Sequence, residues 1–94
     1  MIWAIQFILI SLEEFDKNNS KLNYDYKKKK AHFYFQTACL YFEFGQYLYY
    51  QNKNRDEIIE KFNIAIDYHI LLRKLDNNPL YQMDYASIFF WFAL

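Results

Sequence analysis

The chain has 94 residues, of which 54% are hydrophobic and 23% aromatic, and its 11 basic and 11 acidic residues give a formal net charge of zero. The hydrophobic content excludes a disordered chain, the lone Cys39 excludes a disulfide scaffold, and the balanced charge provides no overall field that attracts nucleic acid. Gly and Pro occur once each and Val does not occur, which leaves few of the residues that a hairpin-rich β fold uses.

The first apolar segment covers residues 1–12, interrupted only by Gln6 and Ser11, and acidic residues follow it. A helix of about twelve residues is roughly 18 Å long, which is short of the ~30 Å hydrocarbon core of a bilayer. The segment has neither the basic start nor the small-residue cleavage site of a secretory signal, and it lacks the arginines of a mitochondrial presequence. We therefore predict a first helix over residues 1–17 that is buried or lies at an interface.

The second predicted helix covers residues 20–51, with Ser20 as its N-cap and Gly45 as the one residue that disfavours a helix. Residues 31–50 are apolar nearly all round, and a helix of this kind is buried on both sides. A transmembrane helix is the alternative, because about twenty residues can span a bilayer. Four polar side chains within the stretch disfavour that alternative: His32, Gln36, Glu43 and Gln46.

Two further helices follow a polar turn at residues 51–54. In the third predicted helix, residues 55–76, apolar side chains recur every three or four positions and so share one face. These are Ile58, Ile59, Phe62, Ala65, Ile66, His69 and Leu72. Asn78 and Pro79 are typical of an N-cap and a first helical position, which predicts a fourth helix over residues 79–94. Its last residues are mostly aromatic and indicate docking against another chain or a membrane interface.

Residues 38–79 place large and small side chains at set positions in two neighbouring helices. The positions are Tyr41, Phe44, Gly45 and Leu48 in the first helix, and Ile58, Phe62 and Ala65 in the second. This pattern resembles the tetratricopeptide repeat family, and the resemblance implies that Phe62 fills the groove between two closely packed helices. The chain departs from the family in its longer turn, in Ile58 and in the late Pro79. We predict an all-α fold with one domain over residues 1–94, in which a tetratricopeptide-like antiparallel hairpin is flanked by short apolar terminal helices.

No group of residues in the sequence points to catalysis. Cys39 and His69 lie on neighbouring predicted helices, but no Asn or Asp is placed to orient the histidine and no helix N-terminus is available to activate the thiol. His32, Cys39 and His69 also lack the spacing of metal ligands. We therefore expect a protein that is not an enzyme, with no catalytic residue, no cofactor, no bound metal and no small-molecule substrate.

Two sets of side chains are candidates for binding other molecules. The first set is a run of four lysines that could contact lipid head groups or phosphate: Lys27, Lys28, Lys29 and Lys30. A solvated helical turn is the simpler interpretation of this run, and no RNA-binding motif accompanies it, so we do not expect a nucleic-acid partner. The candidates for a partner interface are all aromatic: Trp3, Phe7, Tyr41, Phe44, Tyr49, Phe89, Phe90, Trp91 and Phe92.

The composition carries a second resemblance. Just over half of the chain consists of residue types whose codons are rich in A and T, namely Asn, Lys, Ile, Phe, Tyr and Met. In this respect the chain resembles the small unassigned-reading-frame proteins of ciliate mitochondrial genomes. The resemblance implies a non-catalytic, supernumerary subunit of an inner-membrane respiratory complex, peripheral or partly embedded, with NADH dehydrogenase (complex I) as the first choice. Its partners are then other subunits and membrane lipid. The alternatives are a soluble tetratricopeptide-like adaptor and a mitochondrial ribosomal protein.

Overall fold

The computed structural model describes residues 2–18, 24–76 and 78–92, and within them every regular element is a helix. The helices are α1 (Ile2–Asn18), α2 (Tyr24–Tyr50), α3 (Arg55–Leu75) and α4 (Pro79–Phe92). The all-α fold class is therefore confirmed. As the sequence predicts, α4 begins at Pro79, whereas the expected N-cap at Ser20 lies outside the described residues.

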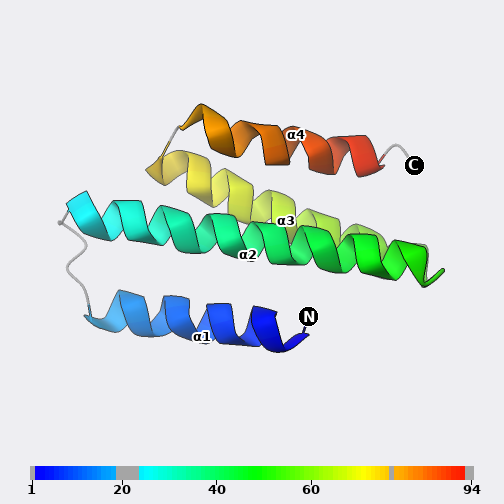
Figure 1. Cartoon of the computed structure of the whole chain (residues 1–94), viewed down its shortest axis with the longest axis horizontal. Coiled ribbons are helices and arrows are strands. Elements are labelled where there is room, and N and C mark those ends of the chain that lie inside the picture. The colour runs from blue at the N-terminus through cyan, green and yellow to red at the C-terminus, as the bar shows by residue number, and fades with distance from the viewer. Residues whose placement is uncertain (1, 19–23, 77, 93–94) are drawn as a thin grey trace.

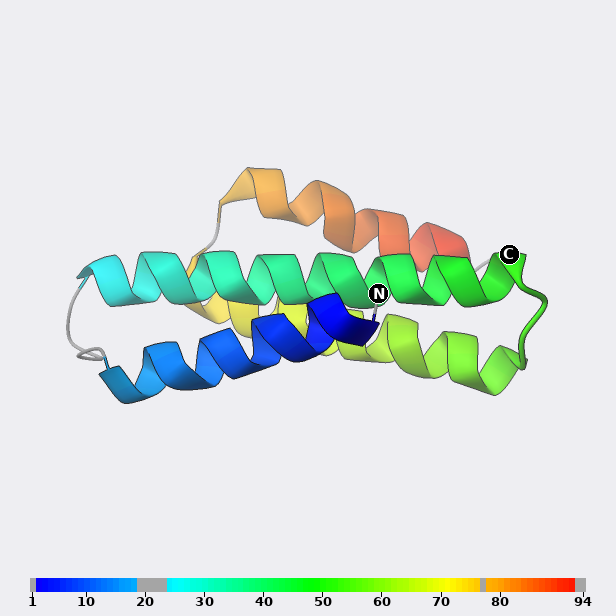
Figure 2. The same ribbon diagram turned by 60° about the horizontal axis from the view of Figure 1, so that its bottom comes forward.

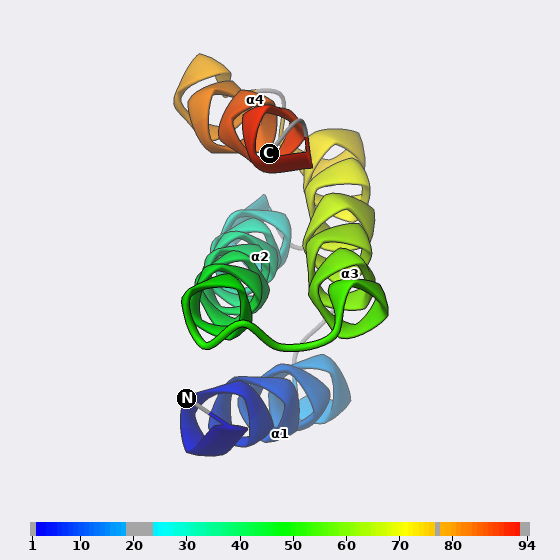
Figure 3. The ribbon, with the colours of Figure 1, turned by 90° about the vertical axis from the view of Figure 1, so that its right-hand side faces the viewer.

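Successive helices run antiparallel and lie side by side in chain order (Figure 1). Among the described residues, α1 packs on α2 alone, while α3 packs on α2 and α4. Figure 2 shows that α1 is inclined to α2. Seen end-on, the helices form an open array with α1 and α4 at its two ends (Figure 3). The Cα atoms extend over 44 × 28 × 16 Å. Each outer helix therefore has one side that no other helix covers.

Asn52, Lys53 and Asn54 shape the turn between α2 and α3. Asn52 adopts a left-handed backbone conformation with φ of 54°. The Lys53 N–H donates to the Leu48 carbonyl at 3.0 Å, which is the hydrogen bond that defines a Schellman motif at a helix end. The side-chain oxygen of Asn54 then accepts a hydrogen bond from the Asp56 N–H at 2.7 Å and caps α3. The predicted polar turn thus ends one helix and begins the next.

The core lies where α2, α3 and α4 meet. Phe62, Ala65 and Ile88 are buried at its centre. The half-buried side chains packed against them are Tyr41, Phe42, Ile58, Ile66, Trp91 and Phe92. Gly45 faces the ring of Phe62 so closely that a β-carbon at this position would lie 2.6 Å from Cδ1. The sequence-based prediction that Phe62 fills the groove between the paired helices is confirmed.

Candidate interaction surfaces and cavity

The first half of α1 is apolar on both of its sides. Ile5 and Ile8 face α2 and are buried, whereas the rest of the helix surface leaves large apolar side chains in solvent. These exposed side chains, which we call the α1 face, are Ile2, Trp3, Phe7 and Ile10. Trp3 is 86% exposed and Phe7 is 72% exposed. Exposed apolar side chains gathered on one element are characteristic of an interaction site.

The aromatic residues near the end of α4 fall into two groups. Phe89 and Phe90 are 50% and 67% exposed, so that their rings remain available to another molecule. Trp91 and Phe92 instead pack on the buried core. Tyr49 of α2 is 40% exposed, and its ring meets that of Trp91 edge-on at a centroid distance of 5.5 Å. Part of the predicted interface therefore packs inside the chain.

Two predicted interface residues in the middle of α2 have partners on α3. The Tyr41 ring stacks on Tyr68, with centroids 6.1 Å apart and an interplanar angle of 12°. The ammonium group of Lys61 lies 5.2 Å from the centroid of the Phe44 ring, which is the geometry of a cation–π contact. Both rings therefore pack against side chains of α3 within the hairpin.

The lysine run at residues 27–30 is not uniform in its surroundings. Its first three side chains are exposed, and their contact with lipid or phosphate stays a prediction. The Lys30 side chain is directed inward, with Nζ 3.1 Å from Oδ1 of Asp16 and 2.9 Å from the Tyr26 hydroxyl. Lys30 therefore acts as a structural residue in this chain.

Asp16, Tyr26 and Lys30 form a hydrogen-bonded network that joins α1 to α2. The Tyr26 hydroxyl donates to Asp16 and accepts from Lys30. Burial raises the pKa of Tyr26, and its hydrogen bond to Asp16 adds to this effect. Burial opposes the charge on Lys30, but its hydrogen bonds to Tyr26 and Asp16 outweigh that penalty and raise its pKa. Sequence reasoning missed this network; the available signal was the spacing of Tyr26 and Lys30, which places both on one helix face.

Phe35 lies next to both Cys39 and His69, and its ring centroid is 6.3 Å from that of His69. Cys39 lines a cavity of about 400 Å³ between α1 and α2, together with Phe7 and Phe35. His69 is 1% exposed and lies against the Tyr85 ring, with centroids 5.6 Å apart. The absence of a catalytic pair stays a prediction from the sequence.

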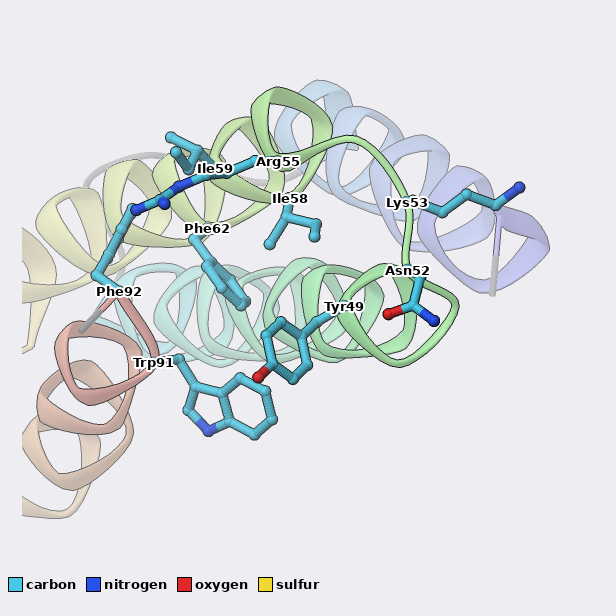
Figure 4. Close-up of a pocket in the computed structure, with 9 residues that line it drawn as sticks. All are labelled: Tyr49, Asn52, Lys53, Arg55, Ile58, Ile59, Phe62, Trp91 and Phe92. Carbon is cyan, nitrogen blue, oxygen red and sulfur yellow. The ribbon is translucent and has the colours of Figure 1, made fainter. Parts of the chain in front are cut away.

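A second cavity, of about 330 Å³, lies where the α2–α3 turn meets the last turn of α4; we call it the turn cavity (Figure 4). Its apolar and aromatic walls are Tyr49, Ile58, Ile59, Phe62, Trp91 and Phe92, and its polar rim is Asn52, Lys53 and Arg55. In Figure 4 the rings of Phe62 and Tyr49 are directed toward one another, Arg55 extends toward Phe92, and Lys53 is directed outward. Sequence reasoning did not predict this cavity, since its walls come from distant parts of the chain.

Comparison with protein-family models, with curated proteins and with solved structures gives no match for this chain. Within residues 2–18, 24–76 and 78–92, none of the helices combines the length and the hydropathy that a membrane span requires. The same part of the chain contains no group of three or more His, Cys, Asp or Glu side chains that could hold a metal ion.

Proposed function

We propose that this protein is a non-catalytic structural subunit of a large hetero-oligomeric assembly, which it joins through the α1 face. The observation that carries the proposal is the exposure of Trp3 and Phe7 on a helix that packs on α2 alone. Full burial of one large apolar side chain is worth about 1.5–3 kcal/mol. Covering these two side chains with a neighbouring subunit would therefore contribute about 3–6 kcal/mol to association.

The arrangement of the outer helices supports a bridging role. α1 and α4 lie at opposite ends of the array (Figure 3), and each carries exposed aromatic side chains. A neighbour on the α1 face and another on Phe89 and Phe90 would be held apart by the α2–α3 hairpin. The high content of residues whose codons are rich in A and T supports a location at the mitochondrial inner membrane. It also supports a respiratory complex as the assembly, with NADH dehydrogenase as the first choice.

The test is isolation of the tagged chain from its native cells in mild detergent, followed by native gel electrophoresis and identification of the proteins that migrate with it. We expect one large complex in the wild type and at least tenfold less of it for the double variant Trp3→Gln, Phe7→Gln. Both side chains are exposed, so the variant keeps its fold. Glu14→Gln, at an exposed position of the same helix outside the α1 face, is the control. Migration of the wild type as a free monomer, or equal recovery of the complex with the double variant, would contradict the proposal.

A peptide-binding adaptor is the second candidate, and the packing of the α2–α3 hairpin favours it. The close approach of Gly45 to Phe62 is the small-against-aromatic contact that the tetratricopeptide resemblance implies. An adaptor of this kind elutes as a monomer or homodimer in size-exclusion chromatography and retains a specific peptide. The structural subunit elutes with its large assembly, so the same preparation separates the two candidates.

A further inference from the structure

The turn cavity combines an apolar interior with a rim of hydrogen-bond donors, and the proposed subunit role uses neither. None of the nine residues that line it is acidic, although Asp56 and Glu57 lie in the adjoining first turn of α3. We infer that the turn cavity binds a small amphipathic carboxylate, such as a medium-chain fatty acid. Its apolar chain lies against the aromatic walls, and its carboxylate pairs with Arg55.

The size of the cavity sets the size of this ligand. Ligand pockets in proteins usually measure about 300–1,000 Å³, and the turn cavity, at about 330 Å³, is at the small end of that range. Since one water molecule occupies about 30 Å³ in the liquid, the cavity holds about ten atoms of similar size. An eight-carbon carboxylate, with ten non-hydrogen atoms, fits this space.

The apolar walls are held in place by contacts with the core. Phe62 is only 2% exposed, and its ring meets that of Trp91 at a centroid distance of 6.3 Å and an angle of 63°. Trp91 in turn meets the Tyr49 ring at 88°. Because these rings are already positioned, an apolar chain entering the cavity orders few side chains.

The charge at the rim selects the head group. In the described part of the chain Arg55 forms no ion pair, so its guanidinium is available to an anion. A guanidinium can donate two parallel hydrogen bonds to a carboxylate, which an alcohol or an ammonium group cannot accept in the same way. Lys53 adds positive charge at the mouth, and Asn52 offers a side-chain amide.

The test uses the fluorescence of Trp91. The chain has two tryptophans, so Trp3→Phe leaves Trp91 as the sole indole reporter. We expect octanoate, added below its micelle concentration at pH 7.5, to change this emission saturably. Its affinity should be at least tenfold higher than that of 1-octanol or octylammonium. Absence of a saturable change, or equal affinity for octanoate and octylammonium, would overturn the inference.

A substitution of Arg55 tests the proposed contact between its guanidinium and the carboxylate of the ligand. We expect Arg55→Gln to weaken octanoate binding at least tenfold and to leave 1-octanol binding unchanged. Lys74→Gln removes an exposed cation from the same helix outside the cavity and is the control. Circular dichroism establishes that each variant is folded. Octanoate binding that is the same in Arg55→Gln and in the wild type would also overturn the inference.

Discussion

Among single residues, Gly45 occupies the tightest place in the hairpin. An alanine here gains about 1 kcal/mol in helix propensity, but its β-carbon would enter the ring of Phe62. Phe42 and Phe92 pack against that ring with centroid distances of 5.7 and 5.5 Å, so a shift of the ring disturbs both contacts. Since overpacking costs about 1–3 kcal/mol, we predict a net loss of about 1 kcal/mol in the free energy of unfolding of Gly45→Ala. Urea denaturation followed by circular dichroism measures it.

A matched alanine substitution separates overpacking from helix propensity. Glu43 is exposed on the same helix, and Glu43→Ala should change the free energy of unfolding by less than about 0.5 kcal/mol. In a Phe62→Leu background the same Gly45→Ala change should cost less, because the smaller side chain leaves space for the methyl group. Equal or greater stability of the single variant Gly45→Ala relative to wild type would show that the Phe62 ring can move.

The cap of α3 is the next residue whose contribution can be isolated. Asn54→Ala removes the acceptor of the 2.7 Å hydrogen bond from the Asp56 N–H, and loss of such a cap costs about 1 kcal/mol. For a domain of this size that loss lowers the melting temperature by about 4–8 °C. Asn54→Asp keeps the acceptor and adds negative charge at the helix N-terminus, so we expect it to be at least as stable as wild type. A melting temperature of Asn54→Ala equal to that of Asn54→Asp would refute the capping role.

Among the helices that the structure describes, α1 packs on α2 alone, and Asp16 links the two helices through Tyr26 and Lys30. Asp16→Ala leaves the buried Tyr26 hydroxyl without its acceptor and Lys30 without its carboxylate. Loss of such partners costs about 1–3 kcal/mol, which is about a fivefold to 150-fold change in an opening equilibrium. We therefore predict that amide hydrogen exchange accelerates by at least about fivefold in α1 and stays unchanged in the α2–α3 hairpin, as mass spectrometry can measure.

The control for α1 is an exposed ion pair on the same helix. Glu13 lies 3.6 Å from Lys17, and both side chains are largely exposed, so Glu13→Ala should have little effect on exchange. If Asp16→Ala instead accelerated exchange equally in all four helices, α1 and the hairpin would unfold as one cooperative unit, and the attachment described here would be wrong.

The helices differ in how well the sequence predicts which of their residues are buried. The spacing of Phe62, Ala65 and Leu72 on α3 predicts its buried face correctly, since Glu60, Asp67 and Lys74 mark an exposed polar side of that helix. In α1 the same reasoning fails, because Ile5 is buried and Trp3 is exposed although both lie in an apolar stretch without a polar side. Periodicity identifies a face only where the opposite face is polar.

Contacts between distant parts of the chain have no local signature. Lys30 looks like its three neighbouring lysines in the sequence, and only the packing of α1 on α2 brings Asp16 to it. The turn cavity likewise exists because α4 returns to the α2–α3 turn and places Trp91 beside Tyr49. The candidate aromatic residues could therefore be identified from composition, but not divided into internal and exposed groups.

In the molecule as a whole, the open array explains why so apolar a chain keeps large side chains in solvent. A closed four-helix bundle would bring α1 and α4 together and cover their outer sides. Here the described residues of α1 and α4 do not touch, and each helix buries one side only. Ile88 of α4 is fully buried while Phe90 is 67% exposed. The uncovered sides are what the proposed neighbouring subunits would bury.

The stability of the whole molecule should fall at alkaline pH. Burial raises the pKa of three tyrosines, Tyr26, Tyr68 and Tyr81, and the nearby Tyr41 and Asp76 add to the effect on the last two, respectively. Hydrogen bonds raise the pKa of Lys30 against the effect of burial. Each group holds its proton more tightly in the folded chain than in the unfolded chain. As the pH rises past about 10, the unfolded chain releases these protons first, and the free energy of unfolding falls.

Urea denaturation at pH 8, 9, 10 and 11 measures this loss. We expect the free energy of unfolding to be nearly constant from pH 8 to 9 and to fall above pH 10, by up to about 1.4 kcal/mol per pH unit for each proton that the folded chain retains. Tyr26→Phe removes one titrating hydroxyl and one of the hydrogen bonds that raise the pKa of Lys30, so the fall should be less steep in this variant. A free energy of unfolding that stayed level or rose between pH 10 and 11 would contradict the four pKa shifts together, because all of them act in the same direction.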